Sequence, residues 1–460
     1  MLFSAAVLVY NIAKDGEYMT DCPNRFIKLY RYLLIFAAVL TVSGAIIGNK
    51  DLYQGLKAIA LCSDLLISDY IAIGGLGAAL FNSGLVTFVS IGVLYFSHDP
   101  INGFTIPTVC LMSGFALFGK NIFNIWPILL GSALYARVRK SHYGAYSAMG
   151  LLATTLSPAV SYIALQDGFS LPNLAMACFV GVLIGFLMPA IAEYTYKILN
   201  GMSLYNMGFA AGLLGMIIVP LLIALGHEPH PVTKWAYGYN LKLGIPLSLL
   251  CVVLIVAGIV KGKKRGLHDY LMLLSTSGRA PEDYLRMFGP APMMINIGVD
   301  GIIATSLLLM VGGDLNGPTI GGILAIMAFS AYGCHALNIF PVMMGVIIAE
   351  MFMSCSFVQP AAQLALLFST TLAPFAGVFG SIFGGVAGFL HLAVVMRSGM
   401  QAQGANLYNN GFAGGVIAIV LYPLITSIFL RHKPFFRQIE WMDTFEDTDD
   451  MPIPPEDDTL

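Results

Sequence analysis

The chain has 460 residues, of which 57% are hydrophobic and only 10% are charged, and its formal net charge is −2. A soluble globular protein carries about 25% charged residues, so this chain has too few charges to cover a water-facing surface. The small net charge excludes a general electrostatic attraction to nucleic acid. The composition predicts an all-α polytopic protein of the cell (inner or plasma) membrane, with the lipid bilayer as its solvent.

The chain opens on an N-terminal segment, 1–24, whose residues 1–13 are apolar but lack the basic start of a secretory signal. Beyond it, apolar runs approach the length needed to cross about 30 Å of hydrocarbon at 1.5 Å per residue. We divide the rest into a first membrane repeat (25–228), a second membrane repeat (229–430) and an acidic cytoplasmic tail (431–460). The tail has too little apolar surface to fold alone.

Polar and turn motifs of the first repeat recur in the second, in the same order. Asp69-Tyr70 returns as Asp283-Tyr284, and the same offset in numbering relates Asn82 to Asn296 and Asn124 to Asn338. The offset changes slightly where Thr154-Thr155 meets Thr370-Thr371, and again where Leu204-Tyr205-Asn206 meets Leu407-Tyr408-Asn409. Chance explains one such match but not an ordered series, so the sequence predicts an internal repeat.

Basic residues indicate that the two repeats face opposite ways. Short loops rich in Lys and Arg stay in the cytoplasm. The basic cluster 137–140 ends one predicted helix, whereas the matching helix ends near Glu350 without basic residues. The predicted helix after Leu204 is followed by the weakly basic loop 226–231, whereas its counterpart in the second repeat is followed by the basic residues 431–437. Matched ends therefore lie on opposite sides, which predicts inverted topology with both termini in the cytoplasm.

An inverted repeat needs an odd number of spans in each half, and about seven is self-consistent. The predicted spans of the first repeat are 29–48, 69–97, 104–119, 122–138, 144–165, 171–197 and 204–225. Those of the second are 241–261, 283–312, 318–333, 337–354, 358–376, 377–397 and 406–429. The two Thr-Thr-Leu-x-Pro segments could instead be re-entrant hairpins, which would lower the number of full crossings.

Matched polar residues mark the places where we expect broken helices. Asn82-Ser83-Gly84 interrupts one long apolar run, and Asn296-Ile297-Gly298 interrupts its counterpart. Broken helices in corresponding positions of two inverted halves are typical of substrate sites, because irregular backbone at membrane depth must be satisfied by protein or by a cavity. The predicted solute-binding residues are Asn82, Asn296, Asn124, Asn338, Thr154, Thr155, Thr370 and Thr371. The threonines could alternatively bond back along their own helices.

Ionisable residues inside the predicted spans do not follow the repeat. Asp300 lies four residues after Asn296, on the same helical face, but its counterpart is Val86. A carboxylate inside an apolar span is a functional candidate by default, so we predict that Asp300 couples transport to a cation or a proton. The alternative is a structural pair with a neighbouring hydroxyl, amide or cation. Lys120 is likewise unmatched, since its counterpart is Cys334.

Cysteine and histidine spacings favour neither metal chemistry nor catalysis. The seven cysteines show no CxxC or other ligand spacing, so we expect no metal site, no disulfide framework and no cofactor. The eight histidines are scattered, and no catalytic constellation stands out, so we expect a protein that is not an enzyme. A homo-oligomer is compatible with this sequence.

The ordered motifs resemble known families. The series Asp-Tyr, Asn-x-Gly, Asn-Gly-x-Thr-Ile, Thr-Thr-Leu-x-Pro and Leu-Tyr-Asn-x-Gly-Phe-Ala is similar to that of an uncharacterised family of polytopic bacterial inner-membrane proteins. This resemblance covers nearly the whole chain and implies a membrane location but no reaction. The stretch 81–86 resembles one in urea transporters, which are also inverted repeats, and a seven-plus-seven plan is similar to nucleobase and sulfate carriers.

Broken helices, paired amides and few charges favour a transporter that moves a small polar solute by alternating access. A passive, channel-like facilitator is the nearest alternative, and a membrane scaffold or sensor is another. A membrane-embedded enzyme is the least favoured class.

The inverted topology predicts which loops are accessible from each side of the membrane. Single cysteines placed in the 137–143 loop and at both termini should react only with reagents that reach the cytoplasm, and a cysteine in the 226–237 loop should react from outside. Labelling of the 226–237 loop and the C-terminus from the same side would contradict the inverted repeat.

Overall fold

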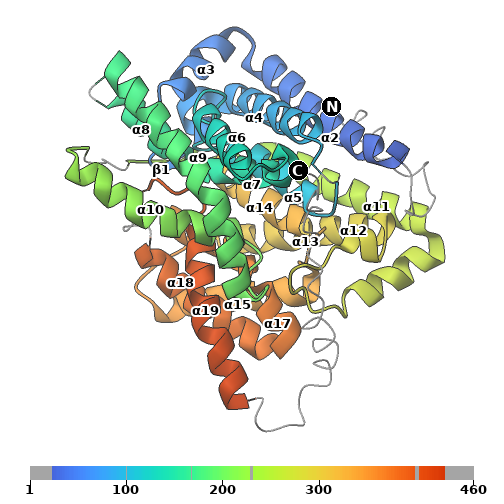
Figure 1. Cartoon of the computed structure of the whole chain (residues 1–460). Helices are drawn as coiled ribbons and strands as arrows, with labels where there is room; N and C mark the ends of the chain where they lie inside the picture. Colours follow the sequence, from blue (N-terminus) through green and yellow to red (C-terminus); the bar gives the residue numbers. More distant parts are fainter. Residues whose placement is uncertain (1–22, 100, 167, 228–231, 399–403, 430–460) are drawn as a thin grey trace, which may run out of the picture. The chain divides into compact units, whose positions relative to one another are not determined.

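The computed structural model describes residues 23–99, 101–166, 168–227, 232–398 and 404–429. The acidic tail 431–460 and nearly all of the N-terminal segment lie outside these ranges. The described residues up to Ile419 form one compact unit, and those from Val420 form a second. Every described element is helical except two strands of three residues, so the all-α expectation is confirmed in its main part (Figure 1).

The elements of the first half precede residue 225. They are α2 (Pro23–Gly48), η1 (Asn49–Asp51), α3 (Leu52–Ala60), β1 (Leu66–Ser68), α4 (Tyr70–Phe96), α5 (Thr105–Phe115), α6 (Trp126–Val138), η2 (Tyr143–Ala145), α7 (Ser147–Ala153), η3 (Thr154–Leu156), α8 (Ser157–Leu165), α9 (Leu171–Leu199) and α10 (Asn206–Ala224).

The second half contains a similar series. It comprises β2 (Val232–Lys234), α11 (Asn240–Leu273), α12 (Tyr284–Met287), α13 (Pro290–Met310), α14 (Gly317–Phe329), α15 (Ala336–Phe352), α16 (Pro360–Phe368), η4 (Ser369–Leu372), α17 (Ala373–Phe379), α18 (Ser381–Ser398) and α19 (Asn409–Phe429).

Ten helices in the described ranges are long and apolar enough to cross a membrane, which makes the chain a polytopic membrane protein. They are Leu29–Ala60, Tyr70–Phe96, Ser147–Leu165, Leu171–Leu199, Asn206–Ala224, Asn240–Leu273, Pro290–Met310, Pro360–Phe379, Ser381–Ser398 and Asn409–Ile428. The expected seven spans per half are too many. Four predicted spans, 104–119, 122–138, 318–333 and 337–354, become helices of 11, 13, 13 and 17 residues. At 1.5 Å per residue these fall short of about 30 Å of hydrocarbon.

The helices break at different places from those expected. Asn82 and Asn296 lie in regular helix, inside α4 and α13. The break in α4 is at Gly75, whose φ of 80° is left-handed, and Gly289, with a φ of 81°, stands just before α13. Helix α11 continues past its predicted end at residue 261 and kinks at Lys263, where φ is 51°.

Left-handed backbone conformations recur at the offsets of the sequence motifs. Five positions of the first half have a left-handed counterpart at the offset that relates Asp69 to Asp283, and a sixth pair has the offset that relates Tyr205 to Tyr408. The pairs are Asn49 and Lys263, Asp64 and Gly278, Gly75 and Gly289, His98 and Gly312, Gly119 and Gly333, and Gly201 and Gly404. Such conformations are uncommon for residues other than glycine, so their recurrence is specific.

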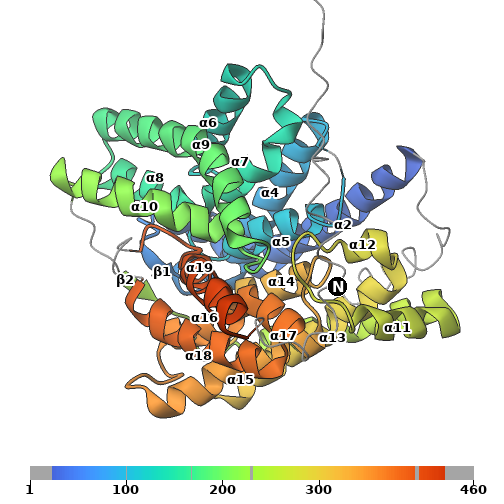
Figure 2. The ribbon, with the colours of Figure 1, turned by 60° about the horizontal axis from the view of Figure 1, so that its bottom comes forward.

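Helix pairings recur as well. Helix α2 packs along α4 as α11 packs along α13, and α6 packs on α9 as α15 packs on α18 (Figure 1, Figure 2). The short helices α5 and α14, one from each half, lie against each other in both views. At their crossing Gly114 meets Gly321 so closely that an added Cβ would lie 3.0 Å from the opposite Cα.

Each half closes the N-terminus of the short helix of the other half. Asp69 accepts a hydrogen bond from the Gly317 N–H at the start of α14 (3.2 Å), and Asp283 accepts one from the Gly103 N–H before α5 (2.7 Å). A carboxylate at this position satisfies open N–H groups and complements the helix dipole. Both amides belong to glycines because a Cβ there would lie 2.3–2.5 Å from the carboxylate oxygen.

Asp69 also joins the first half to strand β2. Its carboxylate accepts hydrogen bonds from the N–H groups of Ile71 and Ala236, in addition to Gly317. Strands β1 and β2 pair in parallel directly beside it, with Leu66 opposite Val232. Three segments distant in sequence therefore meet at one buried carboxylate.

Replacement of Asp69 by alanine should destabilise the protein by roughly 3–5 kcal/mol, because three buried N–H groups lose a charged acceptor. The measurement is the thermal unfolding midpoint of purified protein in detergent. Asp51→Ala removes an equal charge from an exposed position and should have little effect. Equal unfolding midpoints for the two variants would contradict this role of Asp69.

Candidate functional site

Asn82 and Asn296 each hold the irregular backbone that follows a short helix. The Nδ2 atom of Asn82 donates to the carbonyls of Ala116 (2.8 Å) and Lys120 (2.9 Å), just beyond α5. Asn296 donates to the carbonyls of Ser330 (2.8 Å) and Cys334 (2.7 Å), just beyond α14. Both side chains are buried. These bonds supply the partners that carbonyls outside a helix need at membrane depth.

Asn124 and Asn338 also bind carbonyls of the irregular segments that follow α5 and α14. Asn124 donates to the Gly119 carbonyl and Asn338 donates to the Gly333 carbonyl, at glycines with φ of 87° and 103°. The Oδ1 atom of Asn338 accepts the His335 N–H at the start of α15. The role of these four asparagines in solute binding stays a prediction. Their Nδ2 atoms are already used by the backbone.

The four threonines divide into two kinds. Thr154 and Thr370 donate their hydroxyls to the carbonyls of Leu151 and Leu367, three residues back on their own helices. The carbonyls of Thr155 and Thr371 instead cross between the halves, where they accept the N–H groups of Leu407 (3.1 Å) and Leu204 (2.9 Å). The Thr-Thr turns therefore hold the chain just before α19 and α10. Their predicted contact with solute stays a prediction.

Asp300 has one satisfied and one unsatisfied oxygen. It is fully buried, and its Oδ2 accepts the hydroxyl of Ser330 at 2.6 Å. Its Oδ1 has no hydrogen-bond partner, and neither has the Oδ1 of Asn296 one turn earlier. No Lys or Arg side chain among the described residues pairs with Asp300. Two acceptor atoms without donors thus project from the same face of α13.

Aromatic rings fill the region between the halves. Tyr205 stacks on Tyr408, with ring centroids 5.2 Å apart. Tyr205 also meets Phe329 at the end of α14 (4.6 Å), and Tyr408 meets Phe115 at the end of α5 (5.0 Å). The two Leu-Tyr-Asn motifs thus bring their tyrosines together, each against the short helix of the opposite half.

Asp64 is a buried carboxylate that our sequence analysis missed. It accepts hydrogen bonds from the Tyr70 hydroxyl (2.8 Å) and from the amides of Asn121 (3.2 Å) and Asn124 (3.1 Å). Burial raises the pKa of Asp64, and hydrogen bonds from Ser161, Tyr70 and Asn124 act in the opposite direction. Its counterpart is Gly278, so a search for matched motifs could not find it. Its place just before the Asp69-Tyr70 motif was the available signal.

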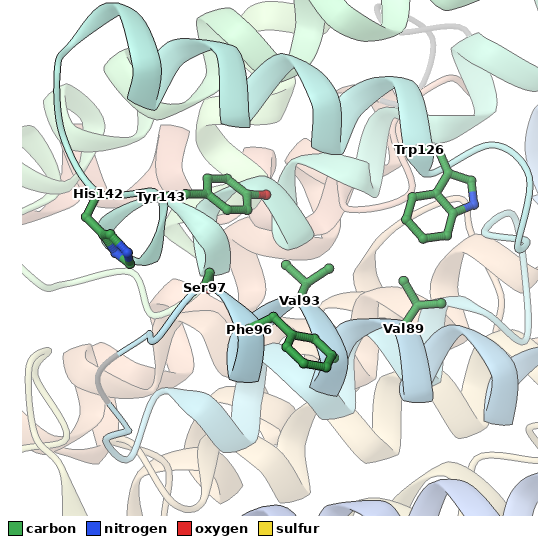
Figure 3. A pocket seen from close by; sticks show the side chains of 8 residues that line it. Val89, Val93, Phe96, Ser97, Trp126, His142 and Tyr143 are labelled. Atoms are coloured by element: carbon green, nitrogen blue, oxygen red, sulfur yellow. The ribbon is translucent and has the colours of Figure 1, made fainter.

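The structure also contains an open pocket of about 500 Å³. Val89, Val93 and Phe96 of α4 line one side, Trp126 at the start of α6 lines another, and His142 and Tyr143 complete it (Figure 3). A second pocket of about 540 Å³ surrounds the break at Gly75 and reaches Tyr239 and Lys242. Neither pocket contains a predicted site residue. Within the described ranges, no three His, Cys, Asp or Glu side chains are grouped to hold a metal ion.

The profile of one protein family, described as a protein of unknown function (DUF1576), matches the chain twice, over residues 48–224 and 263–427. These segments cover most of the chain. The chain belongs to the DUF1576 family. This membership confirms the resemblance to an uncharacterised family of polytopic membrane proteins. The bounds of the two DUF1576 segments are related by offsets close to those of the motifs. No curated protein and no solved structure matches the chain.

The asparagine bonds predict a loss of stability when an amide is removed. Asn296→Leu and Asn82→Leu should each lower the free energy of unfolding by roughly 2–4 kcal/mol, because two buried carbonyls lose their donor. Thermal unfolding in detergent measures the change. Leu85→Met, a volume-conserving change on the same helix as Asn82, is the control and should have a small effect. Unfolding midpoints equal to wild type would contradict the assignment.

Proposed function

We propose that this protein is a membrane transporter of a small polar solute, built from two inverted repeats and working by alternating access. The solute site lies between the halves, near the ends of α5 and α14. Catalysis forms no part of this proposal. The observation that carries it is the reciprocal arrangement of the two short helices.

Short, interrupted helices in corresponding positions of two halves are a feature of secondary transporters. Helices α5 and α14 have 11 and 13 residues, cross at Gly114 and Gly321, and have their N-termini closed by Asp283 and Asp69 of the opposite half. A relative movement of the halves would change the environment of both helix ends together. Alternating access needs such a linkage.

Three observations support the repeat on which the proposal rests. The left-handed positions recur at the motif offsets, and the same family profile matches each half. Among the described residues, five membrane-length helices precede residue 225 and five follow it. An odd number per half is what inversion requires, since two successive copies with an odd number of crossings insert in opposite senses. The distribution of basic residues also favours inverted topology.

Asp300 is the proposed coupling residue. A buried carboxylate with a free oxygen next to the free Oδ1 of Asn296 offers two ligands to a cation, or one acceptor to a proton. A structural carboxylate is normally paired with a basic group or fully hydrogen-bonded. Asp300 has a single hydroxyl donor, Ser330.

Transport is tested with purified protein in proteoliposomes, by uptake of radiolabelled amino acids, sugars, nucleobases, urea and monocarboxylates. We expect at least one class to produce uptake that protein-free liposomes lack. Uptake that never exceeds equilibrium would favour the passive facilitator. Absence of uptake for every class would overturn the transport proposal.

For a solute identified in this way, Asp300→Asn should abolish gradient-driven accumulation while exchange of solute at equilibrium persists. The amide keeps the shape but can neither carry a proton nor balance a cation. Asp51→Asn, at an exposed position, is the control and should accumulate like wild type. Unchanged accumulation by the Asp300 variant would mean that the carboxylate is structural.

A further inference from the structure

Lys120 is a basic residue in a place where a charge is costly. It lies in the irregular segment between α5 and α6 and is 0% exposed. Its Nζ atom contacts the Met112 sulfur at 3.3 Å and the face of the Phe115 ring, with the centroid at 5.1 Å. An ammonium group has three donors, and a thioether is a weak acceptor. In the described part of the chain, no carboxylate pairs with Lys120.

Two more donors without acceptors lie along the contacts that start at Lys120. Tyr408 packs on Phe115, the ring beneath the Lys120 ammonium, and its hydroxyl has no partner. The Nδ2 of Asn406 also has no partner. The Oδ1 of the same amide accepts the Tyr408 N–H (3.0 Å), which sets the orientation of the amide. Asn406 and Tyr408 are 5% and 2% exposed, so bulk solvent does not supply the missing acceptors.

Thr154 and Thr155 connect these groups on the other side. The Thr154 hydroxyl contacts the same Met112 sulfur as Lys120, at 3.3 Å. The next residue, Thr155, contacts Asn406 at 3.5 Å. The chain of contacts thus leads from Lys120 through Met112 and the Thr-Thr turn to Asn406, and from Lys120 through Phe115 to Tyr408.

The repeat-related counterparts of these three residues all have partners. Cys334, the counterpart of Lys120, contacts the Thr370 carbonyl at 3.8 Å. Tyr205, the counterpart of Tyr408, hydrogen-bonds to the Thr370 hydroxyl at 2.7 Å. Ser203, the counterpart of Asn406, hydrogen-bonds to Thr371 at 3.0 Å. The unsatisfied donors therefore belong to only one of the two repeat-related sets of positions and are not a general result of packing two repeats together.

We propose that this cluster of Lys120, Asn406 and Tyr408 binds the carboxylate of a small organic anion. Movement of the anion across the membrane rests on the proposed transport function, whereas its binding can be tested separately. One ammonium group balances a single negative charge, and the amide and hydroxyl can donate to carboxylate oxygens. A phosphate dianion would need a second cation. The small polar solute of the proposed function is thereby specified as a monoanion.

The arrangement also separates two kinds of binding. The acceptors without donors, Oδ1 of Asp300 and Oδ1 of Asn296, belong to α13, whereas the donors on Asn406 and Tyr408 are connected to Lys120 through shared neighbours. A cation or proton and a carboxylate would therefore occupy different places. Joint occupancy leaves the interior without an unpaired charge.

The test is the thermal unfolding of purified full-length protein with acetate, propionate, lactate or benzoate, each compared with its amide at equal ionic strength. We expect at least one carboxylate to raise the unfolding midpoint saturably, with its amide giving no rise. Lys120→Met keeps the side-chain length and should weaken binding at least about tenfold. Lys57→Met removes the same charge from an exposed residue and should bind like wild type.

Tyr408→Phe, which removes only the unpartnered hydroxyl, should also weaken carboxylate binding. This variant keeps the test decisive if Lys120→Met does not fold. Equal effects of acids and amides, no effect of any acid, or unchanged binding by both variants would overturn the site. Carboxylate binding that depends on Lys120 but is followed by no uptake into proteoliposomes would support the site and reject transport.

Discussion

Two carboxylate–amide contacts hold the architecture together. Asp69 receives the Gly317 amide and Asp283 receives the Gly103 amide, so each half completes the short helix of the other. The irregular segments after α5 and α14 depend on this closure, because they begin where the clamped helices end. The asparagines of α4 and α13 then bind carbonyls in those segments and fix where the polar groups lie. These contacts place Asn82, Asn296 and the backbone segments that the two asparagines bind.

The recurring motifs revealed the symmetric part of the structure because a backbone that leaves a helix needs specific side chains to satisfy it. Asn82 and Asn296 are alike since both bind carbonyls 34 and 38 residues further on. The number of spans was overestimated because hydropathy registers apolar residues and not the end of a helix. Residues 116–119 are apolar enough to continue α5, but a side chain of another helix binds carbonyls of this segment and holds it in a non-helical path.

Departures from the repeat were harder to predict than the repeat itself. Asp64 replaces a glycine, Asp300 replaces a valine and Lys120 replaces a cysteine at the matching position. The sequence identified Asp300 and Lys120 as unmatched, yet the difference between a satisfied and an unsatisfied polar atom depends on neighbours from distant segments. Asp64 proves well hydrogen-bonded, whereas Lys120 lacks a strong acceptor. Only the folded arrangement distinguishes the two.

The exchange of carboxylates has a consequence for biosynthesis. Asp69 is made before the α14 terminus that it closes, but Asp283 follows Gly103 by 180 residues. At a synthesis rate of about 5–20 residues per second, α5 exists for roughly 10–40 s before its carboxylate emerges from the ribosome. During that interval the first half resides in the bilayer with an open helix end. Joining of the halves, and not insertion of either, is the event that completes the protein.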